Sequence, residues 1–332
     1  MQQKLVVLFF TLKDHKSDFT ANPSVRIINP TKPEIGRISK KILERIVCEV
    51  KMITKLKQWK NSVSVIDWFK QIPDKKNKTF IQIDIESYYP SITPEILTRV
   101  LDWASNYITI SQEEREIIMK SKESFLFIGE TPWVKKGNSN FDIGMGAWDG
   151  AESTDLVGLF MLWEMRNLKA DIGLFRDDCL LATDSTVGRN IEILKQAIWD
   201  IFHTNGFKIM TEANRKIVNF LDVTLNLEND TFRPYIKPGD SPLYVNSNSN
   251  HPPQVIKNIP AGINKRISTL SSNKQIFDQA APLYQRELNR NGYDFVMKFE
   301  QRTKRKDAEI EKSFGSIHHT PSTLKLTLVQ NF

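Results

Sequence analysis

The chain has 332 residues, of which 40% are hydrophobic, so it is long enough to form two or three packed units. Two cysteines, Cys48 and Cys179, exclude a disulfide framework and a Cys-x-x-Cys zinc site, and they fit a reducing, intracellular setting. The net charge of +7 favours a polyanionic partner such as nucleic acid, although the basic surface of an ordinary soluble protein explains it equally well.

The first apolar run, Leu5–Phe10, predicts a buried strand. It is too short to cross a membrane and lacks the small-residue cleavage site of a signal peptide, so we expect no membrane association. Alternation over 24–28, followed by Asn-Pro, predicts another strand. Apolar residues at helical spacing predict a helix over about 38–56.

The segment 79–92 predicts a strand that leads into a helix. Phe80–Ile85 is rich in β-branched residues, and Thr93 with Pro94 has the pattern of an N-cap followed by the first helical position. Ser111 with Glu114 has the pattern of a capping box, so a further helix is expected to start there.

A glycine-rich loop is expected to feed a long helix within residues 140–165, because Gly144, Gly146 and Gly150 precede an apolar helical face. The glycines do not form a P-loop, since Gly-Lys-Ser/Thr is missing. The next segment, "GLFRDDCLLAT", predicts a hairpin with Asp177 and Asp178 at its tip.

The C-terminal half continues with an amphipathic helix over 188–203 and a hairpin over 217–236 that turns at 228–230. From about 253 to 300 the pattern is helical and strongly basic, and it disappears after 302. Strands and helices are mixed without a regular βαβ order. We therefore predict an α+β fold with a small antiparallel sheet backed by helices.

Carboxylates at the ends of two predicted strands suggest a metal site. Asp84 ends one apolar run, and Asp177 and Asp178 lie on the hairpin. Magnesium prefers hard oxygen ligands, and two-metal phosphoryl transfer needs ions about 3.5–4 Å apart, which a single carboxylate cannot hold. If the two strands are neighbours, these side chains meet at one sheet edge. Taken alone, however, Asp-Asp is more often an ordinary turn pair.

Three segments in chain order resemble motifs A, B and C of the reverse transcriptase palm: "FIQIDIESYYPSI", "MGAWDGAESTDLVGLFML" and "LFRDDCLLAT". "NGFKIMTEANRK" resembles motif D, "NFLDVTLNL" the primer-grip hairpin, and "TLKDHK" and "SVRIINP" segments of the fingers. The resemblance covers about residues 8 to 300 and is strongest to polymerases of Penelope-like and related non-LTR retroelements.

This resemblance implies a right-hand polymerase with fingers, palm and thumb. The fingers would occupy 1–78, apparently shortened at the N-terminus, and the palm 79–237, with a fingers-like helical insertion at about 94–140. The thumb would occupy 238–300, and 301–332 would be a basic, disordered tail.

The resemblance also implies roles for individual residues. Asp84 and Asp177 would be ligands of two Mg²⁺ ions (Mn²⁺ being the alternative), with help from Asp178 and from the carbonyl of Ile85. Gly146 matches the motif B glycine, where a missing side chain lets the backbone approach template and nucleotide.

Four further residues match positions that contact the incoming nucleotide. Arg26 matches the fingers arginine that grips the triphosphate, with Lys13 or Lys16 as its companion. Tyr89 matches the aromatic gate that excludes a 2′-hydroxyl, so the expected substrate is a deoxynucleotide. Taken alone, Tyr88 and Tyr89 read as one core and one surface aromatic.

Lys216 is the candidate motif D lysine that protonates pyrophosphate, and Lys208 is its rival. Two positions depart from the family pattern. Arg176 stands before the Asp pair in place of a small or hydrophobic residue, and Ala151-Glu152-Ser153 replaces the usual Ser-Pro.

The implied activity is RNA-directed DNA synthesis, with an RNA template, a DNA primer and deoxynucleotides as partners. An RNA-templated RNA polymerase conflicts with Tyr89. The alternative is a non-catalytic remnant that only binds nucleic acid. Basic residues of the C-terminal helices would line the duplex or simply form a solvated face: Lys257, Lys265, Arg266, Lys274, Arg286 and Arg290.

Overall fold

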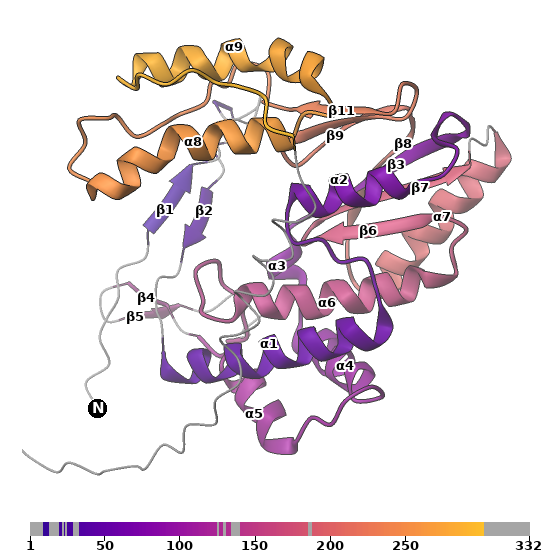
Figure 1. The fold of residues 1–332 in the computed structure, drawn as a ribbon. Helices are drawn as coiled ribbons and strands as arrows, with labels where there is room; N and C mark the ends of the chain where they lie inside the picture. The colour runs from indigo at the N-terminus through magenta and orange to yellow at the C-terminus, as the bar shows by residue number, and fades with distance from the viewer. Residues whose placement is uncertain are drawn as a thin grey trace, which may run out of the picture. The chain divides into compact units, whose positions relative to one another are not determined.

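The structure, a computed structural model, describes residues 9–12, 20–21, 23, 25–28, 33–124, 126–128, 131–133, 140–184 and 188–301 (Figure 1). The chain divides into two compact units, the first ending at Tyr235 and the second beginning at Ile236. This division lies two residues before the predicted start of the thumb.

A four-stranded antiparallel sheet forms the centre of the first unit, in the order β6–β7–β3–β8. Its strands are β3 (Lys78–Ile85), β6 (Asp171–Phe175), β7 (Asp178–Asp184) and β8 (Ile209–Arg215). The predicted hairpin is therefore confirmed, and its second strand pairs directly with β3, in which Asp84 is the last residue but one.

Alternation along β3 gives the sheet two different faces. Ile81, Ile83 and Ile85 are buried in the main hydrophobic core, whereas Phe80 packs near Trp68 and Phe69 on the other face. Asp84 belongs to the face of Phe80, so it comes at the exposed end of a row that starts in an aromatic cluster.

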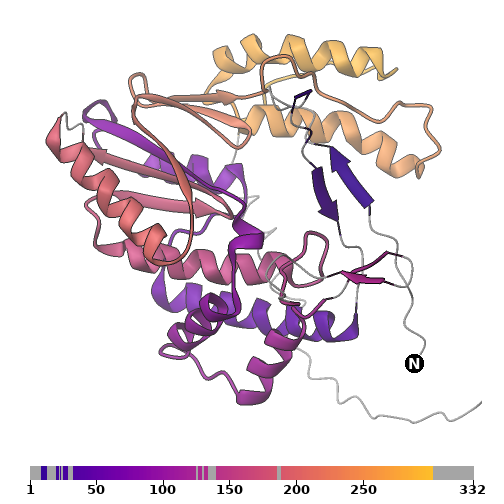
Figure 2. The same cartoon turned by 180° about the vertical axis from the view of Figure 1, so that it is seen from behind.

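Helices build the main core with the Ile81 face of the sheet. They are α1 (Glu34–Thr54), α4 (Pro94–Ala104), α5 (Gln112–Lys120), α6 (Gly150–Glu164) and α7 (Arg189–Thr204). Helix α7 lies along the sheet, as the reverse view in Figure 2 shows, and α1 runs beside α6. The predicted caps are both confirmed: Thr93 caps α4 ahead of Pro94, and Ser111 with Glu114 forms a capping box at α5.

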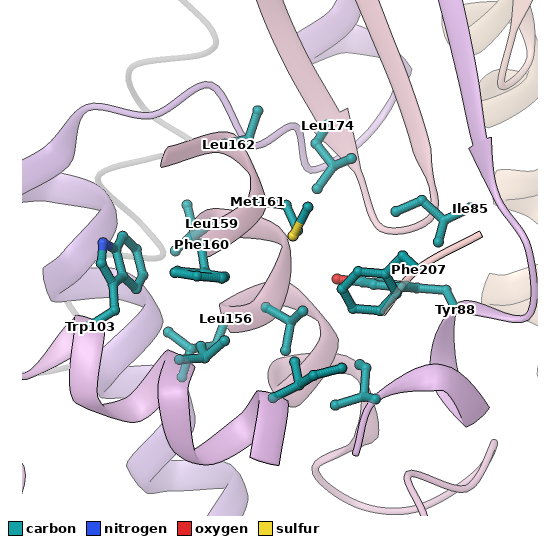
Figure 3. Close-up of a cluster of buried hydrophobic side chains, with 14 of the residues drawn as sticks. Ile85, Tyr88, Trp103, Leu156, Leu159, Phe160, Met161, Leu162, Leu174 and Phe207 are labelled. Atoms are coloured by element: carbon teal, nitrogen blue, oxygen red, sulfur yellow. The ribbon is translucent and has the colours of Figure 1, made fainter. Parts of the chain in front are cut away.

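Helix α6 is buried on most sides, because it passes between α1, α4 and the sheet. Figure 3 shows its side chains Leu156, Phe160 and Met161 among Trp103 of α4 and Leu174 of β6. Gly158 is required on this helix, since an added Cβ would lie 2.7 Å from the Leu174 side chain. The glycine-rich loop and helix predicted for 140–165 are confirmed.

The segment 57–59 covers the outer edge of β6. The Trp59 N–H donates to the Leu174 carbonyl at 2.7 Å, and the Leu174 N–H donates to the Lys57 carbonyl at 3.2 Å. The indole of Trp59 lies on Gly173, where an added Cβ would lie 2.1 Å from a ring atom. These contacts fix the hairpin that carries the Asp pair against the start of helix α2 (Ser62–Gln71).

The hairpin predicted over 217–236, with its turn at 228–230, is confirmed as β10 (Val223–Asn226) and β11 (Thr231–Pro234). The strand β9 (Ile217–Phe220) pairs with β10 and makes the sheet three-stranded. The prediction missed the turn at Leu221, which has a φ of 54° and ends β9. Leucine rarely adopts this conformation, so the sequence carried no turn signal there.

Shorter elements complete the first unit. They are β1 (Phe9–Leu12), β2 (Val25–Ile28), η1 (Lys75–Asn77), α3 (Tyr88–Ser91), β4 (Leu126–Ile128), β5 (Thr131–Trp133) and η2 (Met165–Asn167). The strand predicted at 24–28 is confirmed as β2, which pairs antiparallel with β1. Most of the strand predicted at 5–10 lies outside the described residues.

The second unit is a helical pair, α8 (Pro253–Thr269) and α9 (Lys274–Arg290), around a core that includes Phe277 and Leu288. The prediction of helix up to 300 was wrong, because Gly292, with a φ of 78°, follows the end of α9. The chain then runs without helix to residue 300. Gln285 donates to the Phe295 carbonyl and accepts from the Met297 N–H, and Asn264 accepts from the Lys298 N–H.

The tail predicted from 302 lies outside the described residues. No helix in the described part of the chain is both long enough and apolar enough to cross a membrane.

Candidate active site

The carboxyl end of β3 meets the tip of the β6–β7 hairpin. In the antiparallel register Asp84 is directly opposite Asp178, and the Ile85 N–H donates to the Asp177 carbonyl at 3.1 Å. Opposed residues of an antiparallel pair share a sheet face, so Asp84 and Asp178 share one. The structure thus brings the three predicted carboxylates to one sheet edge.

The hairpin tip is shaped by Arg176, which has a φ of 54°. An arginine in this conformation is uncommon, and the turn exposes its side chain directly before Asp177. Arg176 also faces Asp155 of α6, since its charge lowers the pKa of that carboxyl against the larger opposing effect of burial. The departure from the motif C pattern therefore adds a cation beside the candidate site.

The carboxylates at this edge repel one another. Partial desolvation raises the pKa of Asp84, and the negative charges of Asp177 and Glu86 raise it further. The register pairs Asp84 with Asp178, whereas the hairpin charge that acts on Asp84 is that of Asp177. The Asp84 side chain remains exposed, so a cation can reach it from solvent.

Such an edge suits a divalent cation that completes its shell elsewhere. Within the described ranges, no group of three or more His, Cys, Asp or Glu side chains is arranged to hold a metal ion. Magnesium commonly binds one or two carboxylates and takes its remaining ligands from water and substrate phosphates. The facing carboxylates, with a backbone carbonyl nearby, fit that manner of binding, and their role as ligands remains a prediction.

Two further predicted residues lie near this edge. Tyr89 is half-buried on α3, five residues after Asp84, and contacts Tyr88 edge-on at 6.2 Å between ring centroids. Tyr88 is a core residue whose hydroxyl donates to the Thr154 carbonyl of α6 at 2.8 Å. One tyrosine therefore anchors α3 while its neighbour stays accessible.

The glycine loop adopts the conformation expected of its glycines. Gly146 has a φ of 96°, which side chains disfavour. The preceding residue, Met145, forms a parallel bridge with Ile28 of β2, the strand that carries Arg26. The structure therefore brings the backbone of the predicted fingers arginine close to the loop. Lys13 and Lys16 lie outside the described residues.

Lys216, the first choice for the motif D lysine, is at the wrong end of the sheet. Its ammonium donates to the carbonyls of Lys76 and Lys78, at 2.8 and 2.6 Å, where β3 begins. Six residues of strand, about 20 Å, separate this position from Asp84. The rival Lys208 is at the correct end, since its carbonyl accepts from the Glu86 N–H at 2.9 Å.

Sequence reasoning missed a buried ion pair below the glycine loop. The Lys122 ammonium contacts the Asp149 carboxylate, and both side chains are only 2% exposed. Burial lowers the pKa of Lys122, and the charge of Asp149 opposes that shift. The "WDG" before the α6 pattern hinted at Asp149, but no periodicity pointed to Lys122 as its partner.

Basic residues of the second unit differ between its two helices. On α9, Lys274 pairs with Asp278 at 2.5 Å and Arg290 pairs with Glu287 at 3.2 Å. On α8, Lys257 and Lys265 are exposed at positions that share one helix face. Part of the positive charge of α9 is therefore compensated within the helix, and the nucleic-acid surface stays a prediction.

Comparisons with known proteins show what the chain is similar to in fold. The family model described as Animal helix-turn-helix domain matches residues 243–294, which include α8 and α9. A search of curated protein sequences found no match. Solved structures are similar at low identity, and they include the following three with TM-scores above 0.5.

Telomerase from Candida albicans, in complex with a fragment of telomeric RNA, matches with a TM-score of 0.53 and 13% identity over 85% of this chain and 50% of that chain. Apo telomerase from Candida tropicalis matches with a TM-score of 0.51 and 9% identity, over 85% of this chain and 50% of that chain. The RNA-dependent RNA polymerase of a human picobirnavirus matches with a TM-score of 0.52 and 10% identity, over 93% of this chain and 62% of that chain. The chain thus spans about half the length of the telomerases. Its fold is that of the right-hand polymerases, which confirms the fold that the sequence motifs implied.

Proposed function

We propose that this chain is an RNA-directed DNA polymerase of a retroelement of the Penelope-like or a related non-LTR group. The support comes from a right-hand polymerase fold together with motifs A, B and C in their family order. The single observation that carries the proposal is the meeting of Asp84 with the Asp177–Asp178 tip at one sheet edge.

In the proposed reaction, the 3′-hydroxyl of a DNA primer attacks the α-phosphorus of a deoxynucleotide. A P–O bond to the primer forms, and the bond to pyrophosphate breaks. Asp84 and Asp177 would hold Mg²⁺ with help from Asp178 and the Ile85 carbonyl. When bound, the ions lower the pKa of the attacking hydroxyl and stabilise the leaving oxygen. Lys208 replaces Lys216 as our candidate for protonating pyrophosphate.

Two residues would select the substrate. Arg26, on the strand next to the glycine loop, would bind the triphosphate through its bidentate guanidinium. Tyr89 would exclude a 2′-hydroxyl, because its half-buried ring has little freedom to move aside.

Primer extension on an RNA template tests the proposal. The wild-type chain should extend a DNA primer with deoxynucleotides in Mg²⁺ or Mn²⁺ and should use ribonucleotides poorly. Asp177→Asn should abolish extension. Asp184→Asn is the matched control, because Asp184 ends the same strand at the opposite edge. Full activity of Asp177→Asn would remove the proposal.

A second candidate is a non-catalytic protein that binds nucleic acid. One observation favours it: Arg176, a cation, stands at the hairpin tip directly before the Asp pair, in place of the small or hydrophobic residue of motif C. Under this candidate the chain binds RNA with strong salt dependence and extends no primer in either cation. Any templated extension by the wild type excludes it.

A further inference from the structure

The buried Lys122–Asp149 pair spans the glycine loop that resembles motif B. We infer that Lys122 is a positioning residue, which clamps both ends of the loop 143–148 and so sets where the nucleotide and template meet the loop backbone. The inference rests on the proposed function for its kinetic consequence and on the structure alone for the clamp.

Lys122 holds the two ends of the loop through different groups. Its backbone carbonyl accepts from the Asp142 N–H at 2.9 Å, just before the loop starts. Its ammonium contacts the carboxylate of Asp149, just after the loop ends. One residue therefore fixes both ends, and a shift of Lys122 would move both together.

The Asp149 end is itself tied into helix α6. The Asp149 carbonyl accepts from the Ser153 N–H at 3.0 Å and from its hydroxyl at 2.7 Å. The Ser121 hydroxyl lies 2.7 Å from the Asp149 carboxylate and 3.1 Å from the hydroxyl of Ser39 on α1. The clamp thus connects the loop to both α1 and α6.

Stability alone is a poor reason for such a pair. Removing two charges from water is costly, and apolar replacements of similar size are often neutral or stabilising. A buried ion pair does fix geometry, because neither partner can leave without stranding the other. The pair lies at the ends of the loop in which Gly146 has a φ of 96°. If the loop backbone binds nucleotide and template, its conformation has to be fixed.

The loop is also in backbone contact with strand β2, which carries Arg26. Met145 bridges to Ile28 of β2, and Gly150 packs so closely that an added Cβ would lie 3.2 Å from the Gly144 carbonyl. Loss of the clamp should therefore shift the loop and also its backbone contact with β2.

The test uses Lys122→Met combined with Asp149→Asn in the full chain. The single Lys122→Met variant should fold poorly, because it leaves a buried carboxylate unpaired. The double variant leaves no charge, and the amide that replaces the Asp149 carboxylate keeps an oxygen for the Ser121 hydroxyl. The matched control is Lys40→Met, which removes another lysine that pairs with α6, through Glu152 at 3.2 Å, but keeps the two contacts that Lys122 makes with the loop ends.

The double variant should melt within about 5 °C of the wild type. Its kcat/KM for the deoxynucleotide should fall about a hundredfold, mostly through KM, as expected for a misplaced binding backbone. Amides of residues 142–149 should exchange hydrogen faster, while those of α4 stay protected. Lys40→Met should leave kcat/KM within about twofold.

A double variant with wild-type kcat/KM and wild-type exchange in the loop would overturn the inference. If the wild-type chain extends no primer, the proposed function fails separately, and hydrogen exchange alone decides the clamp. Faster exchange confined to 142–149 then supports it, and unchanged exchange rejects it.

Discussion

The two ends of the β3–β7 strand pair differ in how they treat charge. At one end Lys78 pairs with Asp184 at 2.6 Å, and Lys216 donates to two backbone carbonyls. At the other end Asp84 lies opposite Asp178, and partial burial raises the pKa of Asp84, with the charges of Asp177 and Glu86 raising it further. The same strands carry a compensated end and an end where like charges gather, and only the second needs a cation to relieve the repulsion.

The largest expected difference between the ends is catalytic. Asp84→Asn should lower primer extension about a thousandfold, because the loss of a metal ligand removes several kcal/mol of transition-state stabilisation. Asp184→Asn should retain wild-type extension and lose only about 0.5 kcal/mol of stability, as for other exposed ion pairs. Single-turnover extension measures the first effect and urea unfolding the second. Equal losses of extension in both variants would erase the comparison.

The two lysines of the β8 region should separate stability from activity. Lys216→Met leaves two carbonyls without their cationic donor and should cost about 2 kcal/mol of unfolding free energy, with extension per folded molecule unchanged. Lys208→Met should slow extension and leave the melting temperature unchanged, because Lys208 is exposed. The reverse outcome would restore Lys216 as the motif D lysine.

Magnesium should stabilise the folded protein by binding at the end of the strand pair that carries Asp84, Asp177 and Asp178. At a Mg²⁺ concentration ten times its dissociation constant, the free energy of unfolding should rise by about 1.4 kcal/mol. Asp84→Asn should lose this gain and, without the ion, should be at least as stable as the wild type, since it removes a repelling charge. Differential scanning fluorimetry with Mg²⁺, and with K⁺ at matched ionic strength, measures both. A Mg²⁺ shift that survives in Asp84→Asn would move the binding site away from this edge.

The smallest expected effect is a difference in reactivity between the two cysteine thiols, which reports how tightly the hairpin next to Asp178 is packed. Cys179 follows Asp178 and is buried, and burial raises the pKa of its thiol, whereas Cys48 is exposed. Native protein should therefore react with a thiol reagent at Cys48 alone, and Cys179 should react on unfolding. Mass spectrometry of labelled peptides reads this directly. Rapid native labelling of Cys179 would mean that the hairpin opens despite the surrounding core.

Many of the helices and strands could be predicted from local sequence patterns, and the structure confirms them. Thr93 and Ser111 cap helices as their spacing predicts, and "FIQID" lies within the predicted strand, which ends at Ile85. The resemblance to palm motifs then supplied the pairing of this strand with the Asp177 hairpin, which local pattern alone could not give.

What could not be predicted depends on tertiary contacts or on unusual backbone. Leu221 has a positive φ that its residue type does not predict, so the strand that precedes the predicted hairpin was not separated from it. The sequence favoured Lys216 over Lys208, and only the folded sheet shows that they lie at opposite ends of it. Lys122 and Asp149 are 27 residues apart, and only the folded chain shows that they meet.

The cover that residues 57–59 place on β6 has a consequence for handling this protein. An open strand edge is a template for pairing with another chain, and here Trp59 and Lys57 already occupy the hydrogen-bonding groups of Leu174. A fragment that began at α2 would uncover this edge beside the candidate site. Such a fragment should self-associate, so any minimal palm made from this chain should begin upstream of Lys57.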